Sequence, residues 1–370
     1  MFRLAVANLV QNKTRLLISV VGVGLALTLV LFFGAIFTGA QARLTVYVDH
    51  AGADIWVSQE GVRTMHLSES ALPVSIVEEV KTVPGVEQAV PILYTTGMIE
   101  ANGKESIAYV FGVPPDAPMG GPWRIVEGAS APGPGEIIID RAIASQMDVR
   151  VGDQVTAVGQ QMTIAGLTSG TSSIVSSPAF VRFDDFARAR GQGQIVSFVL
   201  VKVSAGEAAS AVVARIQGQI GGVTVQTREE FASEERKLVQ DMSADIISIM
   251  NTAGYLTGLA VVVLTIYIAT VARRKEYGVL KAMGVSNGRL FQIVLVQALI
   301  TVGLGLATGL SITLLLSVLI PRFNELMVLS ISTSSLLQVT LISIVLGGIA
   351  ALLPARQLAG LEPVAIIRRG

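Results

Sequence analysis

The stretch ARRKEYGVLKAMGVSNGRLFQ, Ala272–Gln292, is a short basic segment between two long apolar runs. Three adjacent bases, Arg273, Arg274 and Lys275, end the first run, because each would cost about 2.5–3.5 kcal/mol at the centre of a bilayer. Beyond them apolar residues recur at helical spacing, and Gly284 suits a left-handed helix cap. The segment therefore predicts a short amphipathic helix at a membrane surface, a turn, and the start of another membrane helix.

The rest of the chain has the composition of a membrane protein. Of its 370 residues 51% are hydrophobic and only 15% are charged, and the mean hydropathy is +0.64. A helix needs about 20 apolar residues to cross roughly 30 Å of hydrocarbon. The uncharged runs of this length are Leu16–Phe37, Ile246–Val271, Leu290–Ile320 and Leu336–Leu353. The first is longer than the apolar core of a signal peptide, so we expect it to be retained.

The N-terminal segment Met1–Thr14 places Phe2, Val6 and Leu9 on one helical face. It suits a helix lying in the membrane interface, and it equally suits an extension of the first span. Residues 1–40 are thus expected to form an interfacial helix and the first membrane helix.

Residues 41–245 contain no span and instead mix strand-like and helical patterns. They predict a large α+β domain between the first and second helices, with two lobes because Pro and Gly cluster over Pro114–Gly135. Thr227–Met250 carries an apolar stripe without Gly or Pro and predicts one long helix from this domain into the second span. Residues 246–370 then hold membrane helices two to four.

The bases are segregated along the chain. Short segments before the first span, around residues 273–289 and after the last span are basic, whereas residues 41–245 hold 15 bases and 24 acids. The positive-inside rule then places both termini and the basic connection in the cytoplasm and the large domain outside.

The chemistry of common enzymes is missing from the sequence. There is no Cys and no G-x-x-x-x-G-K-[ST] motif, and the two histidines, His50 and His66, stand outside any catalytic or metal-binding pattern. We expect a surface or structural role for both histidines. The sequence predicts no catalytic residue, no metal site, no bound cofactor and no nucleic-acid partner.

Small residues recur at four-residue spacing in the spans, which allows membrane helices to approach closely. Gly254 and Gly258 lie in the second span, and Gly305 and Gly309 in the third. The sequence leaves open whether they pack helices within one subunit or join two. No span carries an ionisable side chain, which disfavours an ion path and favours an apolar or amphipathic cargo, or no cargo through the helices.

Four stretches together resemble the MacB/FtsX-type ABC transporter permeases. RRKEYGVLKAMGVSNGRLFQIVLVQ resembles the R-x-E-x-G-x-L-[KR]-A-x-G segment of that family, and ALLPARQLAGLEPVAIIRR resembles its C-terminal motif. NLVQNKTRLLISVVGVGLAL is similar to its N-terminal signature. VPGVEQAVPILY and GEIIIDRAIASQMDVRVGDQV are similar to its extracytoplasmic core domain.

The resemblance implies four membrane helices, one plus three, with the large α+β domain outside a bacterial plasma membrane. It implies a coupling helix at 273–285 that docks on a separate cytoplasmic P-loop ATPase, which would bind the ATP and Mg²⁺. It also implies a second permease copy, as homodimer or heterodimer, with a periplasmic adaptor as an optional further partner. The residues that match the coupling segment, including its variable apolar positions, are Glu276, Tyr277, Gly278, Leu280, Lys281, Ala282, Met283 and Gly284.

Three functions are compatible with the sequence. The first is a permease subunit that expels or extracts a hydrophobic or amphipathic substrate. The second is a subunit that transmits ATP-driven motion to an outside partner, such as a cell-wall hydrolase, without transport. The third is a receptor or scaffold that uses no ATPase. If the coupling helix exists, we expect Tyr277, Leu280 and Met283 to be accessible before the ATPase binds.

Overall fold

The structure is a computed structural model that describes residues 11, 13–66, 68–172, 177–191, 193–272, 274–323, 327 and 329–359. The predicted surface helix over Met1–Thr14 and the basic tail at Arg368 and Arg369 therefore fall largely outside the described residues. The chain divides into two compact units. The membrane unit comprises residues 1–39, 243–322 and 329–370, and the inserted unit comprises residues 40–242 and 323–328.

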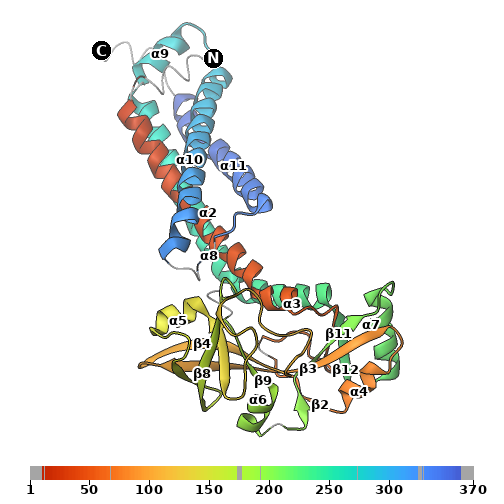
Figure 1. Cartoon of the computed structure of the whole chain (residues 1–370). Coiled ribbons are helices and arrows are strands. Elements are labelled where there is room, and N and C mark those ends of the chain that lie inside the picture. Colours follow the sequence, from red (N-terminus) through yellow and green to blue (C-terminus); the bar gives the residue numbers. More distant parts are fainter. Residues whose placement is uncertain are drawn as a thin grey trace. The chain divides into compact units, whose positions relative to one another are not determined.

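The membrane unit is built from long apolar helices (Figure 1). The segments long and apolar enough to cross a membrane are Leu16–Gln41, Ser248–Ala272, Asn287–Phe323 and Thr333–Arg356. They belong to helices α2 (Lys13–Leu44), α8 (Arg228–Ala272), α10 (Asn287–Phe323) and α11 (Thr333–Ala359). The predicted layout of four membrane helices, with an α+β domain between the first and second, is confirmed.

The core of the membrane unit is aliphatic and is shared by all four helices. Val23, Leu27 and Val30 of α2 join Val262 and Ile266 of α8 in one buried cluster. The same cluster includes Ile293, Val294 and Ala298 of α10 and Val339 and Ala350 of α11. Since lipid offers no hydrophobic drive for these helices to associate, close van der Waals packing must hold them together.

The inserted unit is organised by one mixed sheet of ten strands in the order β12-β1-β11-β3-β4-β9-β6-β8-β5, with β7 pairing β3 and β8. A separate two-stranded sheet pairs β2 with β10. The strands are β1 (Ile55–Gln59), β2 (Leu72–Pro73), β3 (Val86–Ala101), β4 (Lys104–Val113), β5 (Ile125–Gly128), β6 (Glu136–Asp140), β7 (Gln154–Ala157), β8 (Gln160–Thr168), β9 (Pro178–Arg182), β10 (Ile195–Val196), β11 (Phe198–Val203) and β12 (Val223–Thr227).

Short helices complete the inserted unit. They are α3 (Val46–His50), α4 (Ile76–Lys81), α5 (Arg141–Met147), α6 (Phe183–Arg190) and α7 (Ala209–Gln219). The sequence has helical spacing over Ser75–Thr82 and Ala208–Ile220, and the structure forms helices α4 and α7 there. Strands β7 and β8 form a hairpin whose turn residues are Val158 and Gly159, at φ +51° and +74°.

Two lobes were predicted from the Pro and Gly cluster at Pro114–Gly135, and that position for the boundary is wrong. One aliphatic core forms around β4, β6, β7, β8 and α5, and another around β1, β11, β12, α4 and α7. Pro114–Gly135 lies between β4 and β6, which both contribute to the first core. The chain passes between the two cores along the 16-residue strand β3 instead. A third core, rich in aromatic side chains, includes Trp56, Phe111, Phe180 and Phe198.

The long helix predicted from Thr227–Met250 is confirmed. Helix α8 continues for 45 residues from Arg228 to Ala272, beginning within the inserted unit and ending within the membrane unit. Phe231 near its start is fully buried in the aromatic core, stacked on Trp56 with ring centroids 4.7 Å apart. Val262 and Ile266 near its end are buried in the membrane unit.

Candidate functional site

The connection from α8 to α10 forms a short helix, α9 (Arg274–Ala282), at the end of the bundle where α8 stops (Figure 1). The helix ends in a Schellman motif. Gly284 adopts φ +89°, its N–H donates to the Lys281 carbonyl at 3.0 Å, and the Val285 N–H donates to the Leu280 carbonyl at 3.1 Å. A residue with a Cβ would be strained at this left-handed position. The sequence therefore fixes where α9 stops and the chain turns back.

One face of α9 anchors the helix to the bundle. Tyr277 is only 2% exposed and belongs to the same buried cluster as Leu290 and Ile293 of α10. Leu280 and Val285 pack against that cluster, which provides the apolar contact that often accompanies a Schellman motif. Gly278 is also buried. These contacts hold α9 in a defined place on the membrane unit.

The opposite face of α9 is exposed. Val279 is 51% and Met283 is 68% exposed, and Glu276 is also exposed. These three residues are spaced i, i+3, i+7, so they follow one stripe on the helix. Lys281 is half-buried, and Ala282 and Gly284 are exposed. We call Glu276, Val279 and Met283 the α9 stripe.

The expected accessibility of the coupling residues is therefore wrong for Tyr277. At 100° per residue, Tyr277 and Val279 lie on nearly opposite sides of the helix, and so the apolar residues divide between two faces. The sequence interpretation assigned the stripe to Tyr277, Leu280 and Met283 and placed Val279 only beside them. The four-residue spacing of Val279 and Met283 is the signal that could have identified it.

The four glycines singled out in the spans all contact α2 of the same chain. A Cβ on Gly254 would clash with Val30 Cγ2, and one on Gly258 would lie 3.5 Å from Ala26 Cβ. On α10, a Cβ at Gly305 would come 2.6 Å from Val23 Cγ1. At Gly309 it would meet the Gly24 carbonyl oxygen at 3.0 Å. Packing within one chain is one of the two arrangements that the sequence left open.

A Gly305→Val variant should test this packing. The added side chain would have to displace Val23, whose Cβ would lie 2.8 Å from the new Cβ, and overpacking of this kind costs about 1–3 kcal/mol. We expect a lower unfolding temperature for the purified protein in detergent. Gly303→Val is the matched control on the same helix, because a Cβ there meets nothing within 4 Å. Equal stability of the two variants would contradict the contact with α2.

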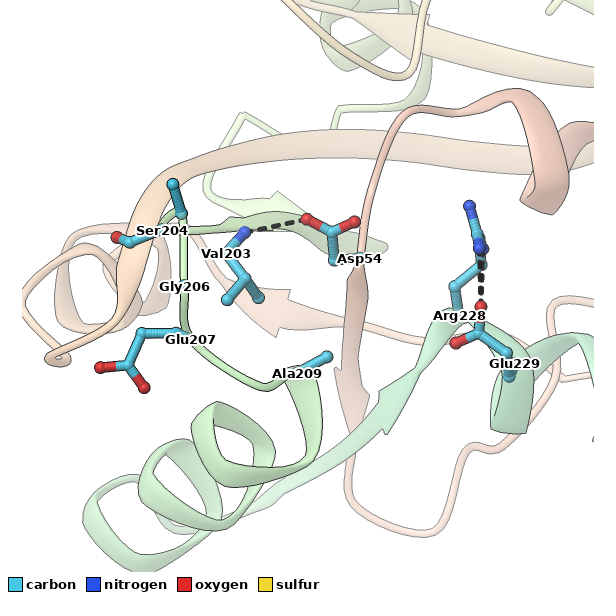
Figure 2. Close-up of a pocket in the computed structure, with 9 residues that line it drawn as sticks. Asp54, Val203, Ser204, Gly206, Glu207, Ala209, Arg228 and Glu229 are labelled. Carbon is cyan, nitrogen blue, oxygen red and sulfur yellow. Dashed lines mark hydrogen bonds and ion pairs between the residues drawn. The ribbon is translucent and has the colours of Figure 1, made fainter.

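The inserted unit carries an open polar groove of about 360 Å³ beside the starts of α7 and α8 (Figure 2). The carboxylates that line this groove form hydrogen bonds or ion pairs with neighbouring residues. Asp54 accepts from the Val203 N–H at 3.0 Å, and Glu229 accepts from Arg228, which holds the pKa of the Glu229 carboxyl below its usual range. Glu207, also in the groove, pairs with Arg215 at 2.9 Å. At the edge of the groove the Arg228 N–H donates to the Asp54 carbonyl at 2.9 Å, which joins the start of α8 to the segment before β1.

The two histidines make structural contacts. His50 Nδ1 lies 2.8 Å from the Val46 carbonyl, and the ring stacks on Trp123 with centroids 5.2 Å apart. His66 is buried, with Nδ1 2.6 Å from Glu235 Oε2 of α8. Among the described residues, no group of three or more His, Asp or Glu is placed to hold a metal ion.

Comparison with known proteins places this arrangement in a family. Residues 16–219 match the model of the MacB-like periplasmic core domain, and residues 248–363 match the FtsX-like permease C-terminal domain. The chain belongs to the MacB/FtsX-type ABC transporter permeases. As a permease component of an ABC transporter, it is embedded in a membrane and has an ATPase as partner.

Relatives of known sequence agree with the family. An uncharacterized ABC transporter permease of Mycobacterium tuberculosis strain H37Rv is 23% identical over 370 residues, 97% of each chain. The macrolide export ATP-binding/permease protein MacB 1 of Aeromonas hydrophila is 32% identical over 108 residues, 29% of this chain and 17% of that protein. The periplasmic region of MacB from Actinobacillus actinomycetemcomitans superposes with a TM-score of 0.39 at 10% identity, covering 50% of this chain and 93% of that one.

Proposed function

We propose that this chain is the permease subunit of an ATP-driven exporter in which α9 docks on a separate ATPase. The proposed output is the expulsion or extraction of a hydrophobic or amphipathic substrate by the inserted unit on the outer side of the membrane. The observation that carries the proposal is the two-faced α9. Its Tyr277 face is anchored in the bundle, while Val279 and Met283 present exposed apolar surface beside Glu276.

Helix α8 supports the proposed transmission of motion. A docked ATPase would move α9, and α9 is joined to the end of α8. Helix α8 is one unbroken helix whose first turns are buried in the inserted unit. A movement of its C-terminal end would therefore be transmitted along the helix to the inserted unit. The ATPase activity is proposed to lie wholly in the partner, with ATP and Mg²⁺ bound there and no cofactor bound by this chain.

The remaining partners follow from the same proposal. The subunit would work as a dimer with a second permease copy, identical or different, and a periplasmic adaptor could extend its path. Basic residues near the spans, such as Lys13, Lys281 and Arg289, favour a bacterial plasma membrane with both termini in the cytoplasm. Neighbouring anionic lipid would be attracted to the same bases.

Reconstitution of the permease with its ATPase in proteoliposomes tests the proposed export. We expect ATP hydrolysis to rise several-fold when an amphipathic probe such as a macrolide or a fluorescent lysolipid is added, and the probe to accumulate on the side of the inserted unit. The matched control is the same complex with an ATPase that binds but does not hydrolyse ATP. Hydrolysis that no amphiphile stimulates, together with unchanged accumulation in cells lacking the permease, would contradict export.

A second function remains a candidate because the mechanical route through α8 needs no cargo. In that case the ATP-driven movement of the inserted unit would activate an outside partner, such as a cell-wall hydrolase. Co-purification of such an enzyme, with an activity that requires ATP turnover by the complex, would favour this function over export.

A further inference from the structure

The membrane unit contains a cavity of about 150 Å³ among α2, α8, α11 and the segment before α11. Asn251 and Tyr255 of α8 contribute side chains, as do Thr38 of α2 and Ser335 and Gln338 of α11. We call this cavity the Asn251 pocket. This volume is many times the roughly 10–15 Å³ that a cavity needs to hold one water, so it has room for a small polar group and the first carbons of a chain.

The pocket combines an uncharged polar wall with an apolar one. None of the described residues that line it is charged, whereas hydroxyl and amide groups come from Asn251, Ser335 and Gln338. Val30, Leu31 and Val339, all buried, contribute the apolar part of the lining. Such a lining disfavours an ionised group, because a charge would lose its hydration without gaining a counter-charge.

Asn251 lines the pocket and also has an unused acceptor. Its Oδ1 is buried and has no hydrogen-bond partner among the described residues. A buried acceptor without a donor costs free energy, so an occupant that brings an O–H group would be stabilised here.

The depth of the pocket matches the polar boundary of a bilayer. Thr38, Asn251 and Ser335 each lie two or three residues inside the end of their span. At 1.5 Å rise per residue this is about 3–5 Å from the span ends. In a bilayer this region is close to the interface, where the hydrocarbon core gives way to the polar groups of lipids.

We propose that the Asn251 pocket binds a neutral, hydroxyl-bearing membrane lipid of the acylglycerol class. The lipid hydroxyl donates to Asn251 Oδ1 after the amide turns toward it, an ester carbonyl accepts from the hydroxyl and amide groups that line the pocket, and the acyl chain packs on Val30, Leu31 and Val339. Lipid binding requires neither ATP nor transport. A failure of the export proposal would therefore leave this proposal intact, and the reverse also holds.

Gly34 provides a way to close the pocket. It lines the pocket on α2, and a Cβ added there meets nothing within 4 Å. The Cβ of a Gly34→Leu side chain therefore displaces no neighbour, and the rest of the side chain should occupy the cavity. Gly348→Leu is the matched control, because Gly348 of α11 is also free of neighbours within 4 Å and does not line the pocket.

The experiment uses the full-length protein in nanodiscs and a diacylglycerol probe whose acyl chain carries a diazirine and an alkyne. After irradiation, labelled peptides are identified by mass spectrometry. We expect labelling to concentrate on the segments around Gly34, Asn251 and Ser335. It should fall about tenfold in Gly34→Leu and stay unchanged in Gly348→Leu.

Two further arms test the chemistry of the site. A probe with the hydroxyl replaced by phosphate, and one with the hydroxyl methylated, should each label these segments about tenfold less, because both remove the O–H donor. In Asn251→Leu the hydroxyl probe should label no more strongly than the phosphate and methylated probes. If Gly34→Leu does not fold, this variant alone tests whether the pocket binds the lipid hydroxyl. Labelling spread evenly over all four helices, or unaffected by both variants, would overturn the proposal and indicate that only water fills the pocket.

Discussion

A Met283→Glu variant is expected to lose binding to the ATPase, with a dissociation constant raised about a hundredfold. Met283 is 68% exposed at the end of the α9 stripe and would be covered when a partner docks. A carboxylate placed there must be desolvated without a counter-charge, at a cost on the order of 3 kcal/mol after relaxation. Titration of the purified ATPase against the permease in nanodiscs measures the effect. ATP hydrolysis by the complex should respond in parallel.

Two controls separate a docking defect from a general effect of charge. Thr14→Glu introduces the same charge at an exposed position near the start of α2, outside α9, and should leave the affinity unchanged. Met283→Leu keeps the apolar surface and should bind nearly as well as the original protein. If Met283→Glu bound the ATPase normally, the α9 stripe would not be the docking surface, and the proposed route from α9 through α8 would have to be abandoned.

The local features of α9 could be predicted from the sequence because they depend on neighbouring residues. The bases at 273–275 predict the end of a membrane helix, and Gly284 predicts the left-handed cap that its φ of +89° confirms. Which apolar face is buried depends on α10, whose Leu290 and Ile293 belong to the cluster that covers Tyr277. Periodicity gives a helix its faces but does not say which of two apolar faces a distant helix will cover.

In the inserted unit, too, contacts between distant parts of the chain could not be predicted from local sequence patterns. Its α+β character and two lobes follow from local patterns, whereas the boundary between its two aliphatic cores does not. The two cores are set by pairings such as β1 with β12 and β4 with β9, which join strands that are far apart in the sequence. The contact between His66 and Glu235 spans 169 residues, and nothing in the local sequence of either residue indicates it.

That contact leads to the second large expected effect, on stability. Glu235 of α8 is fully buried, and its carboxylate accepts from the backbone N–H of Met65 and lies 2.6 Å from His66 Nδ1. A Glu235→Leu variant would leave both groups without that partner inside the domain. Each buried donor left unsatisfied costs about 1–3 kcal/mol, so the loss of both contacts removes a large part of the stability of a typical domain. We expect the unfolding temperature of the inserted unit to fall by about 10 °C.

Tryptophan fluorescence reports this transition, because both tryptophans of the chain, Trp56 and Trp123, lie in the inserted unit. The variant also has a local spectroscopic signature. Burial raises the pKa of Tyr109 and the nearby Glu235 raises it further, so the pKa should move toward its ordinary value in Glu235→Leu. Ultraviolet titration of tyrosine absorbance measures this change.

Neighbouring substitutions distinguish the buried contact from a general weakening of α8. Glu234, the adjacent residue, forms ion pairs with Lys237 at 3.0 Å and Arg63 at 3.8 Å at the surface, so Glu234→Leu should cost less than about 1 kcal/mol. Adding His66→Phe to Glu235→Leu should recover part of the lost stability, because the unpaired imidazole is removed along with its partner. If the double variant were less stable by the full sum of the single effects, His66 and Glu235 would be acting independently. Their contact would then not be what holds the start of α8 to the inserted unit.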